Sequence, residues 1–551
     1  MYYFPWLDAA MSVRPRRLSA LVLGSRRRRS ATAAAVGVLA LIPASPALAA
    51  ADSGALGAAS ARPGASLLDL GGSVDTGSLD EITSIIHARD SWAAGYTGKG
   101  VDVALIDTGV APVQGLSSGN VVDGPDLSFD SVHPDVRYKD AYGHGTHMAS
   151  IIAGRDQAGS PSSYLDRTRF TGVAPDARIV NVKVGAADGA ADVSQVIAAI
   201  NWVTEHAHAG GLNIRVLNLS YGTPSGQDYG VDPLAYAVEN AWRKGIVVVV
   251  SGGNDGTSFQ SLANPAQDPP VIAVGAEDPV GTEQPLDDTV PAFSDRGTAL
   301  RHVDVVAPAV HVLGLRVPNS YVDQTFPSAR VGTRYFRGSG TSQAAAVATG
   351  AAALLLQRNP ALTPDQVKVL LAQSATPIPN GTVTNTGAGL IDVSAAESLA
   401  DPVALLGGAG ATLAAEVDAQ NSLSAPAAGT GSLELARGGS HVAFRGTTLS
   451  GEQDIFAAGW TGASWAQQAA AGTTWTGGTW NGNDWTGTGW TSSGDWAATT
   501  WKTKPWFGGS WSNGWVSRTW TSGGWDSRTW TDDDWGSRTW TDDAWATGGW
   551  G

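Results

Sequence analysis

Between about residues 100 and 375, short runs of β-branched and aliphatic residues alternate with longer segments that carry apolar residues at helical spacing. Apolar residues dominate the short runs, which is typical of strands buried on both faces of a parallel sheet. Alternation of this kind predicts an α/β fold with a mostly parallel central sheet. The predicted strands are 101–106, 179–184, 214–219, 246–250 and 271–274, and the predicted helices are 146–153, 194–209, 233–244, 344–356 and 367–375.

The helix predicted at 344–356 is apolar on every side apart from Thr349 and Gly350, which indicates burial within a large core. Ser342 falls at its first turn, where backbone N–H groups have no intrahelical partner and the macrodipole favours negative charge. A serine there can be a nucleophile whose oxyanion is stabilised by its own N–H. Taken alone, a serine at this position is more simply an ordinary helix cap. Only partners elsewhere in the chain decide between these two roles.

The 551 residues leave room for a large core and two or three units, and the absence of cysteine excludes disulfides and thiol chemistry. Residues 1–49 combine a basic head, an apolar stretch and a small-residue cleavage site, the pattern of a signal peptide. We therefore expect a secreted protein, extracellular or associated with the cell wall. Removal of residues 1–49 lowers the formal net charge of the protein from −15 to about −21, which argues against nucleic acid as a partner. No later stretch is long and apolar enough to form a stable membrane anchor.

Polar residues beyond predicted strands and at a helix entrance are the candidates for chemistry. Asp107 and Asn254 each follow an apolar run, at the strand ends where functional residues gather in such sheets. Taken singly, each could be a simple turn former. His144 and His147, three apart, could suggest a metal pair, but a third ligand and the glutamate of zinc peptidases are missing. We read His144 as an exposed base and His147 as packed into the following helix.

Four stretches together resemble the subtilisin-like serine proteases (subtilases, peptidase S8 family). They carry Asp107, His144, Asn254 and Ser342, with Asp, His and Ser in the family's chain order, and the resemblance covers about residues 86–400. It implies a three-layer subtilisin-like fold and a serine endopeptidase that needs no cofactor for its chemistry. Ser342 would attack the scissile carbonyl, His144 would transfer the proton, and Asp107 would orient the imidazole. The Asn254 amide and the Ser342 backbone N–H would form the oxyanion hole.

The resemblance also implies that an extended polypeptide substrate adds as a strand along the cleft. The predicted substrate-binding residues are Gly189, Ala190, Ala191, Ser220, Tyr221, Gly222, Ser251, Gly252 and Gly253. A structural Ca²⁺ is a further possibility, because many relatives bind one at various loops. The acidic stretch that could hold it contains Asp123, Asp126, Asp130 and Asp135, and the alternative is a solvated acidic loop.

The last 150 residues have a different composition. Residues 401–455 are rich in Ala, Gly and Ser, which is typical of a linker or small module. Residues 456–551 contain 18 tryptophans, and 14 of the 17 steps between them are five residues long. This period suits neither an ordinary strand nor a helix stripe, so a flexible arm and a β-solenoid both remain open. Exposed tryptophans can stack on sugars, and we expect a cell-wall or polysaccharide contact there.

The predicted organisation is a signal peptide (1–49), a short N-terminal or pro segment (50–85), a peptidase domain (86–400), a linker or small module (401–455) and the repeat tail (456–551). Two other functions stay open besides the secreted endopeptidase. One is a catalytically quiet subtilase scaffold used for binding. The other is a surface protein that binds the cell wall through its tryptophan-rich tail.

Overall fold

The computed structural model describes residues 77–132, 135–257, 261–405, 408–422, 424–444, 447–455, 458–474 and 515–517. All of them belong to one of the two units into which the chain divides, residues 63–551. The predicted signal peptide, most of the segment 50–85 and most of the tryptophan repeat lie outside the described residues. Within the described ranges, no helix combines the length and the apolarity that crossing a bilayer requires.

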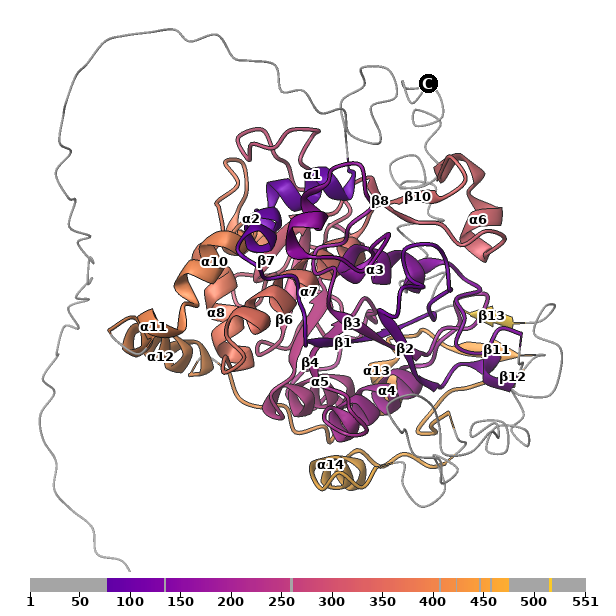
Figure 1. Cartoon of the computed structure of the whole chain (residues 1–551). Helices are drawn as coiled ribbons and strands as arrows, with labels where there is room; N and C mark the ends of the chain where they lie inside the picture. Colours follow the sequence, from indigo (N-terminus) through magenta and orange to yellow (C-terminus); the bar gives the residue numbers. More distant parts are fainter. Residues whose placement is uncertain are drawn as a thin grey trace, which may run out of the picture. The chain divides into compact units, whose positions relative to one another are not determined.

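A seven-stranded sheet forms the centre of the structure (Figure 1), in the order β2-β3-β1-β4-β5-β6-β7. Every neighbouring pair in it is parallel. The strands are β1 (Asp102–Asp107), β2 (Val121–Asp126), β3 (Arg178–Lys183), β4 (Ile214–Leu219), β5 (Val247–Ser251), β6 (Ile272–Glu277) and β7 (Val305–Pro308). The α/β fold with a mostly parallel sheet is therefore confirmed.

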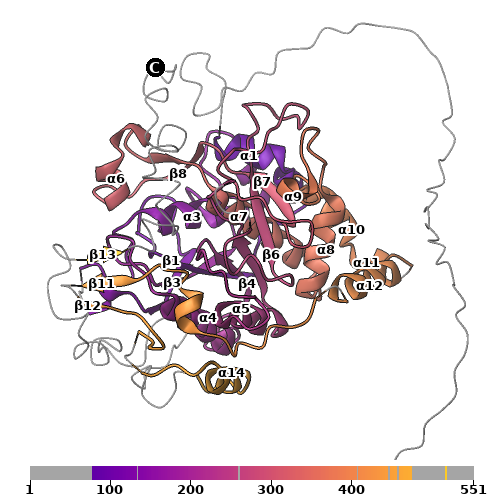
Figure 2. The ribbon, with the colours of Figure 1, turned by 180° about the vertical axis from the view of Figure 1, so that it is seen from behind.

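Helices cover both faces of this sheet, with α3 and α7 on one side and α4 and α5 on the other (Figures 1 and 2). The helices up to residue 400 are α1 (Leu79–Ile85), α2 (Ala88–Ala93), α3 (His144–Ala153), α4 (Val193–His206), α5 (Pro233–Arg243), α6 (Tyr321–Thr325), α7 (Thr341–Arg358), α8 (Pro364–Ser374), α9 (Val383–Thr386) and α10 (Val393–Leu399). Helix α7 contacts β4, β5, β6 and β7, and its residues 341–356 are all buried. The sequence prediction of a buried helix there is confirmed.

Smaller elements complete the described chain. They are the antiparallel sheet of β8 (Val312–Leu315), β10 (Tyr335–Gly338) and β9 (Arg330–Val331), a second one of β12 (Thr447–Thr448), β11 (Val442–Phe444) and β13 (Trp515–Ser517), and the short 3-10 helices at 129–132, 161–165 and 327–329. After residue 400 come α11 (Pro402–Leu405), α12 (Gly408–Asn421), α13 (Leu433–Ala436) and α14 (Gly462–Ala470). Helices α13 and α14 pack against α5, and α13 also contacts α4.

The first two tryptophans of the repeat belong to this packed C-terminal segment. The rings of Trp460 and Trp465 stack with centroids 5.0 Å apart, and Trp465 also meets Tyr236 of α5 edge-on at 5.5 Å. Both tryptophans are buried. These two rings therefore serve packing, whereas the repeat between 475 and 514 and beyond 517 lies outside the described residues.

Candidate active site

The carboxylate of Asp107 and the imidazole of His144 form the centre of the site. Asp107 is the last residue of β1, and His144 is the first residue of α3. The Nδ1 atom of His144 lies 2.9 Å from Oδ1 and 3.0 Å from Oδ2 of Asp107. The expectation that His144 is exposed is wrong, because its side chain is 0 % exposed and that of Asp107 only 1 %. Its helix is buried along its whole length, so the ring is enclosed at the strand end.

Burial and hydrogen bonding shift the pKa of the Asp107 carboxyl group in opposite directions. Burial raises the pKa of its carboxyl group, while the charge and hydrogen bond of His144 and the backbone N–H of Thr108 lower it. The Thr108 N–H donates to Oδ1 at 2.7 Å. The hydroxyl of Thr108 in turn donates to Asp140 at 2.8 Å. Asp140 accepts from the backbone N–H groups of Gly143 and Thr146, on either side of His144. One hydrogen-bond network therefore fixes the Asp107 carboxylate and the backbone around His144.

The close approach of α3 to the loop after β1 requires a glycine beside His144. A Cβ atom on Gly145 would lie 2.2 Å from the carbonyl oxygen of Gly109 and 3.0 Å from Oδ1 of Asp107. No side chain fits there, because real Cβ contacts essentially never fall below 3.0 Å. Gly145 instead donates its backbone N–H to the Thr108 hydroxyl at 2.8 Å.

Ser342 is the second residue of α7, as the sequence predicted for its first turn. The N-cap of this helix is Gly340, which has no side chain to cap with, so the interpretation of Ser342 as a helix cap is wrong. Helix α7 packs against α3 and also contacts β1, the elements that carry His144 and Asp107. The carbonyl oxygen of Ser342 accepts a hydrogen bond from the Ser220 hydroxyl at 3.3 Å.

Asn254 is held beside the start of α7 by a threonine that sequence reasoning missed. Its Oδ1 atom accepts hydrogen bonds from the backbone N–H of Thr341 at 2.9 Å and from the Thr341 hydroxyl at 3.0 Å. The N–H of Gly253 donates to the same hydroxyl at 3.2 Å. Because Thr341 directly precedes Ser342, these contacts place the Asn254 amide next to the Ser342 backbone. The only signal for Thr341 was its position in the Gly-Thr-Ser stretch.

The predicted substrate-binding residues lie at the carboxyl ends of neighbouring strands. Residues 220–222 follow β4, and Ser251 ends β5, with Gly252 and Gly253 after it. Strands β1, β4 and β5 are adjacent in the sheet, so these segments lie near the end of Asp107's strand. Residues 189–191 directly precede Asp192, the N-cap of α4. Ala190, Ala191, Ser220, Tyr221 and Ser251 are buried, and Gly222 is half-buried.

The acidic stretch has protein partners rather than an open cluster of carboxylates. Asp126 accepts from the N–H groups of Ser128 and Tyr138, both at 2.9 Å. Asp130 is paired with the buried Lys183 at 2.8 Å, and Asp123 accepts from Asn181 at 2.8 Å. In the ranges that the structure describes, no three His, Asp or Glu side chains come together in a way that could hold a metal ion.

His147 belongs to the core of the domain rather than to the reacting groups. Its Nε2 atom lies 3.2 Å from the carbonyl oxygen of Phe336 in β10. Burial lowers the pKa of His147 to about 3, so the ring is neutral at ordinary pH. A buried neutral imidazole inside α3 agrees with the prediction that this residue packs into the helix.

The parallel sheet thus carries an Asp–His pair at the end of β1, and Ser342 lies in the first turn of the buried helix α7. The model of the subtilase family (peptidase S8) matches residues 98–394, more than half of the chain, and the chain belongs to this family. Its peptidase domain is therefore of the serine endopeptidase class.

Individual relatives show the same relationship. The chain is 38 % identical to serine protease AprX of Bacillus subtilis (strain 168) over 301 residues, which cover 53 % of this chain and 65 % of AprX. It is 35 % identical to subtilisin DY of Bacillus licheniformis over 314 residues, which cover 57 % of this chain and 96 % of that protein. The match thus spans just under two thirds of AprX and nearly all of subtilisin DY. The crystal structure of fervidolysin from Fervidobacterium pennivorans, a keratinolytic enzyme, matches with a TM-score of 0.45 and 29 % identity, over 58 % of this chain and 45 % of fervidolysin.

Proposed function

We propose that the protein is a secreted serine endopeptidase in which Asp107, His144 and Ser342 form the catalytic triad. The observation that carries this proposal is the pair of hydrogen-bond distances, 2.9 and 3.0 Å, between His144 Nδ1 and the buried Asp107 carboxylate. An imidazole held in this way by a carboxylate is the arrangement that activates a serine. The position of Ser342 on α7, which packs against the helix of His144, supports the third member.

Asp107 decides which nitrogen of His144 is basic. Because the carboxylate accepts a hydrogen bond at Nδ1, the proton of the neutral ring is on Nδ1 and Nε2 carries the lone pair. Nε2 takes the proton of the Ser342 hydroxyl as Oγ bonds to the carbonyl carbon of the substrate. The imidazolium then gives this proton to the leaving amine, and the acyl-enzyme remains on Ser342. Water then attacks the acyl carbon while Nε2 takes its proton. The imidazolium returns this proton to Oγ of Ser342 as the acyl–Oγ bond breaks and the carboxylic acid product leaves.

The Asn254 amide and the backbone N–H of Ser342 serve as the oxyanion hole in this mechanism. Two observations support the assignment: Thr341 fixes Oδ1 of Asn254, and Ser342 lies in the first turn of α7, where backbone N–H groups lack intrahelical acceptors. With Oδ1 occupied by Thr341, the amide nitrogen is the donor end of the side chain. Donors fixed in advance stabilise charge without reorganisation when it develops on the carbonyl oxygen.

We propose extended polypeptides as substrates, bound along 189–191 and 220–222 with 251–253 beside them. The support is the position of these segments next to the strand ends that carry Asp107 and Asn254. The C-terminal segment forms part of this neighbourhood, because the hydroxyl of Thr223 donates to the carbonyl oxygen of Ala436 at 2.7 Å. Secretion is proposed from residues 1–49. Cell-wall or polysaccharide contact through 456–551 stays a prediction, since most of that tail lies outside the described residues.

Peptide hydrolysis tests the proposed function. Purified protein without residues 1–49 is incubated with a library of peptide p-nitroanilides, beside the Ser342→Ala variant. We expect turnover by the parent protein and a loss on the order of 10⁶ in kcat in the variant, the magnitude known for this residue in subtilisin-type triads. Equal turnover by both proteins would refute the assignment of Ser342, and no turnover by the parent would favour the catalytically quiet scaffold.

A further inference from the structure

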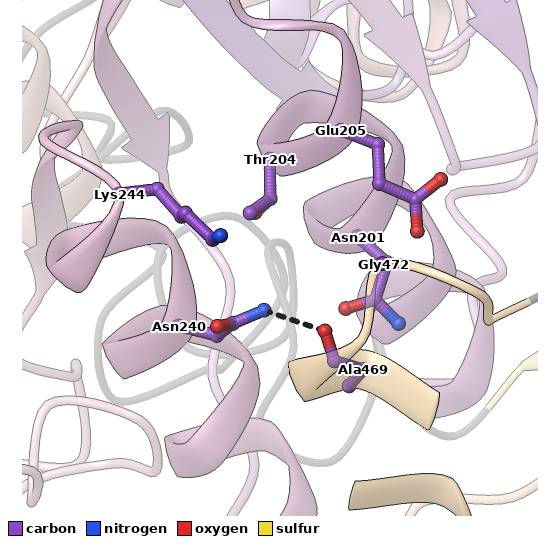
Figure 3. A pocket seen from close by; sticks show the side chains of 7 residues that line it. All are labelled: Asn201, Thr204, Glu205, Asn240, Lys244, Ala469 and Gly472. Atoms are coloured by element: carbon purple, nitrogen blue, oxygen red, sulfur yellow. Dashed lines mark hydrogen bonds between the residues drawn. The ribbon is translucent and has the colours of Figure 1, made fainter. Parts of the chain in front are cut away.

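A polar cavity lies between α4, α5 and the C-terminal segment (Figure 3), among residues that the triad mechanism does not use. Its volume is about 290 Å³, at the small end of the range of ligand pockets. The lining residues are Asn201, Thr204, Glu205, Asn240, Lys244, Ala469 and Gly472. Helix α4, helix α5 and the C-terminal segment therefore line one small cavity.

Asn201 is the residue that points to a ligand. Its side chain is buried, with 2 % exposed, and neither its Oδ1 nor its Nδ2 atom has a hydrogen-bond partner among the described residues. Figure 3 shows the amide directed into the cavity. A buried amide without partners costs free energy, and an ordered water, an ion or a ligand is what can complete its hydrogen bonds.

Two ionisable groups that can carry opposite charges, Glu205 and Lys244, lie beside this amide. Burial raises the pKa of Glu205 to about 7, so its carboxylate form predominates above that pH. Glu205 follows Asn201 by one helical turn on α4, and its Oε1 accepts from the hydroxyl of Thr474 at 3.2 Å. Lys244 is the C-cap of α5 and its side chain is exposed. Asn240 donates to the carbonyl oxygen of Ala469 at 3.2 Å, which fixes the C-terminal wall. The cavity thus offers a carboxylate, an ammonium group and an amide that can both donate and accept.

This combination selects among ligand classes. Once ionised, above its pKa of about 7, Glu205 repels a lone anion such as phosphate, and Lys244 repels a lone metal cation. Among the described residues that line the cavity there is no aromatic ring, so they offer a sugar no stacking surface. We propose that this cavity binds a small zwitterion with a free α-ammonium and a free α-carboxylate group, a single amino acid or a dipeptide. Glu205 receives the ammonium group, Lys244 the carboxylate, and Asn201 pairs with the polar atoms between them.

A ligand bound in this cavity connects the C-terminal segment to α4 and α5. Ala469 and Gly472 form one wall of the cavity, and Thr474 bonds to Glu205 from the same segment, so a bound ligand ties this segment to α4 and α5. A ligand that binds only the folded state raises its stability. If the proposed proteolysis takes place, its shortest products belong to this ligand class, and this one point rests on the proposed function.

Isothermal titration calorimetry of the full chain without residues 1–49 tests the proposal. The Ser342→Ala variant is used as the host, so that dipeptides are not consumed. The probes are L-alanyl-L-alanine and L-alanine, with N-acetyl-L-alanine, L-alaninamide, glucose and CaCl₂ as comparisons. Asn201→Leu removes the amide at nearly constant volume, Glu205→Gln removes the acid, and Asn380→Leu, at an exposed position between α8 and α9, is the matched control.

We expect saturable binding of at least one zwitterion, and at least about tenfold weaker binding of the two capped compounds, since each lacks one charge. Asn201→Leu and Glu205→Gln should each weaken binding by about tenfold or more, while Asn380→Leu leaves it unchanged. The thermal midpoint of Asn201→Leu should equal or exceed that of its host, because no internal hydrogen bond is lost. Absence of zwitterion binding, equal binding by Asn201→Leu, or preferential binding of glucose or Ca²⁺ would overturn the proposal. None of these results depends on whether Ser342 is the nucleophile.

Discussion

Arg437 donates through Nε to the carboxylate of Asp192 at 2.7 Å, across 245 residues of sequence, and both side chains are 0 % exposed. Asp192 is also the N-cap of α4, where its Oδ1 accepts from the N–H of Ser194 at 2.9 Å. Arg437 further donates to the carbonyl oxygens of Gly451 at 2.7 Å and Gln453 at 2.6 Å. These bonds hold Arg437 and the loop at Gly451 and Gln453 against α4, the helix that follows the proposed substrate segment 189–191.

The first prediction concerns this buried pair. Arg437→Met leaves the Asp192 carboxylate buried without its cation, and we expect a loss of about 3–5 kcal/mol in the free energy of unfolding. Urea denaturation followed by circular dichroism measures it. Arg169→Met is the control, because Arg169 pairs with Asp166 where both side chains are exposed, and it should cost less than about 1 kcal/mol. Similar small losses of unfolding free energy in both variants would show that the Arg437–Asp192 pair does not stabilise the fold appreciably.

The second prediction concerns Thr341 as a positioning residue. Thr341→Val removes the hydroxyl that donates to Asn254 Oδ1 and accepts from the Gly253 N–H, and it leaves the backbone bond to Asn254 in place. We expect kcat to fall about tenfold with KM nearly unchanged, since the oxyanion donor is displaced only slightly. Thr333→Val, at an exposed position, should leave both constants unchanged. A larger change in KM than in kcat would contradict this role.

The third prediction concerns the carboxylate behind the imidazole. Asp107→Asn presents an amide N–H to Nδ1 of His144, which favours the tautomer with its proton on Nε2, so the ring can no longer accept the serine proton. We expect kcat to fall by about 10⁴ while the far-ultraviolet circular dichroism spectrum stays that of the parent. A loss below about tenfold with the fold intact would mean that Asp107 does not act on His144.

The fourth prediction concerns pH and Glu397, which is buried on α10. Burial raises the pKa of Glu397 from 4.5 to about 7, so the folded state holds its proton at pH values where the unfolded chain has released it. Stability contributed by the protonated form is fully present below about pH 4.5 and is lost as pH rises through about 7. The total effect is on the order of 3 kcal/mol at most.

The Glu397→Gln variant tests this linkage directly. Its free energy of unfolding, measured from pH 4 to 8, should fall less steeply between about pH 4.5 and 7 than that of the parent protein. Glu283→Gln, at an exposed side chain, should follow the parent curve. Parallel curves for the parent and Glu397→Gln would show that the Glu397 carboxyl group does not hold its proton in the folded state.

The sequence predicted the inner part of the sheet because apolar residues dominate β1, β3, β4, β5 and β6. Strand β2 was missed, since Asp123, Gly124 and Pro125 interrupt it, and only an edge strand with one neighbour tolerates them. Helix α1 was missed within 50–85, although Ser78 caps it by accepting from the N–H of Glu81 at 3.1 Å. The Ala/Gly/Ser-rich composition of residues 50–85 led us to expect no helix there, although Ser78 is a typical N-cap residue.

The sequence predicted those candidate site residues whose type and position beside a strand or helix end suggested chemistry. Asp107 and Asn254 follow strands, Ser342 opens a helix, and the chain order of Asp107, His144 and Ser342 indicated the family. Thr341 could not be found, because its role depends on a contact with a residue 87 positions away. The burial of His144 and the packing of the Ala/Gly-rich segment through Arg437 are likewise tertiary effects that local composition does not encode.

Mass spectrometry after labelling with a fluorophosphonate tests the central claim most directly. Such a probe forms a covalent bond only with a serine made nucleophilic by its surroundings. We expect a single phosphonyl adduct, on the peptide that contains Ser342, and its disappearance in both Ser342→Ala and His144→Ala. An adduct on another serine, or full labelling of Ser342 in the His144→Ala variant, would contradict the triad.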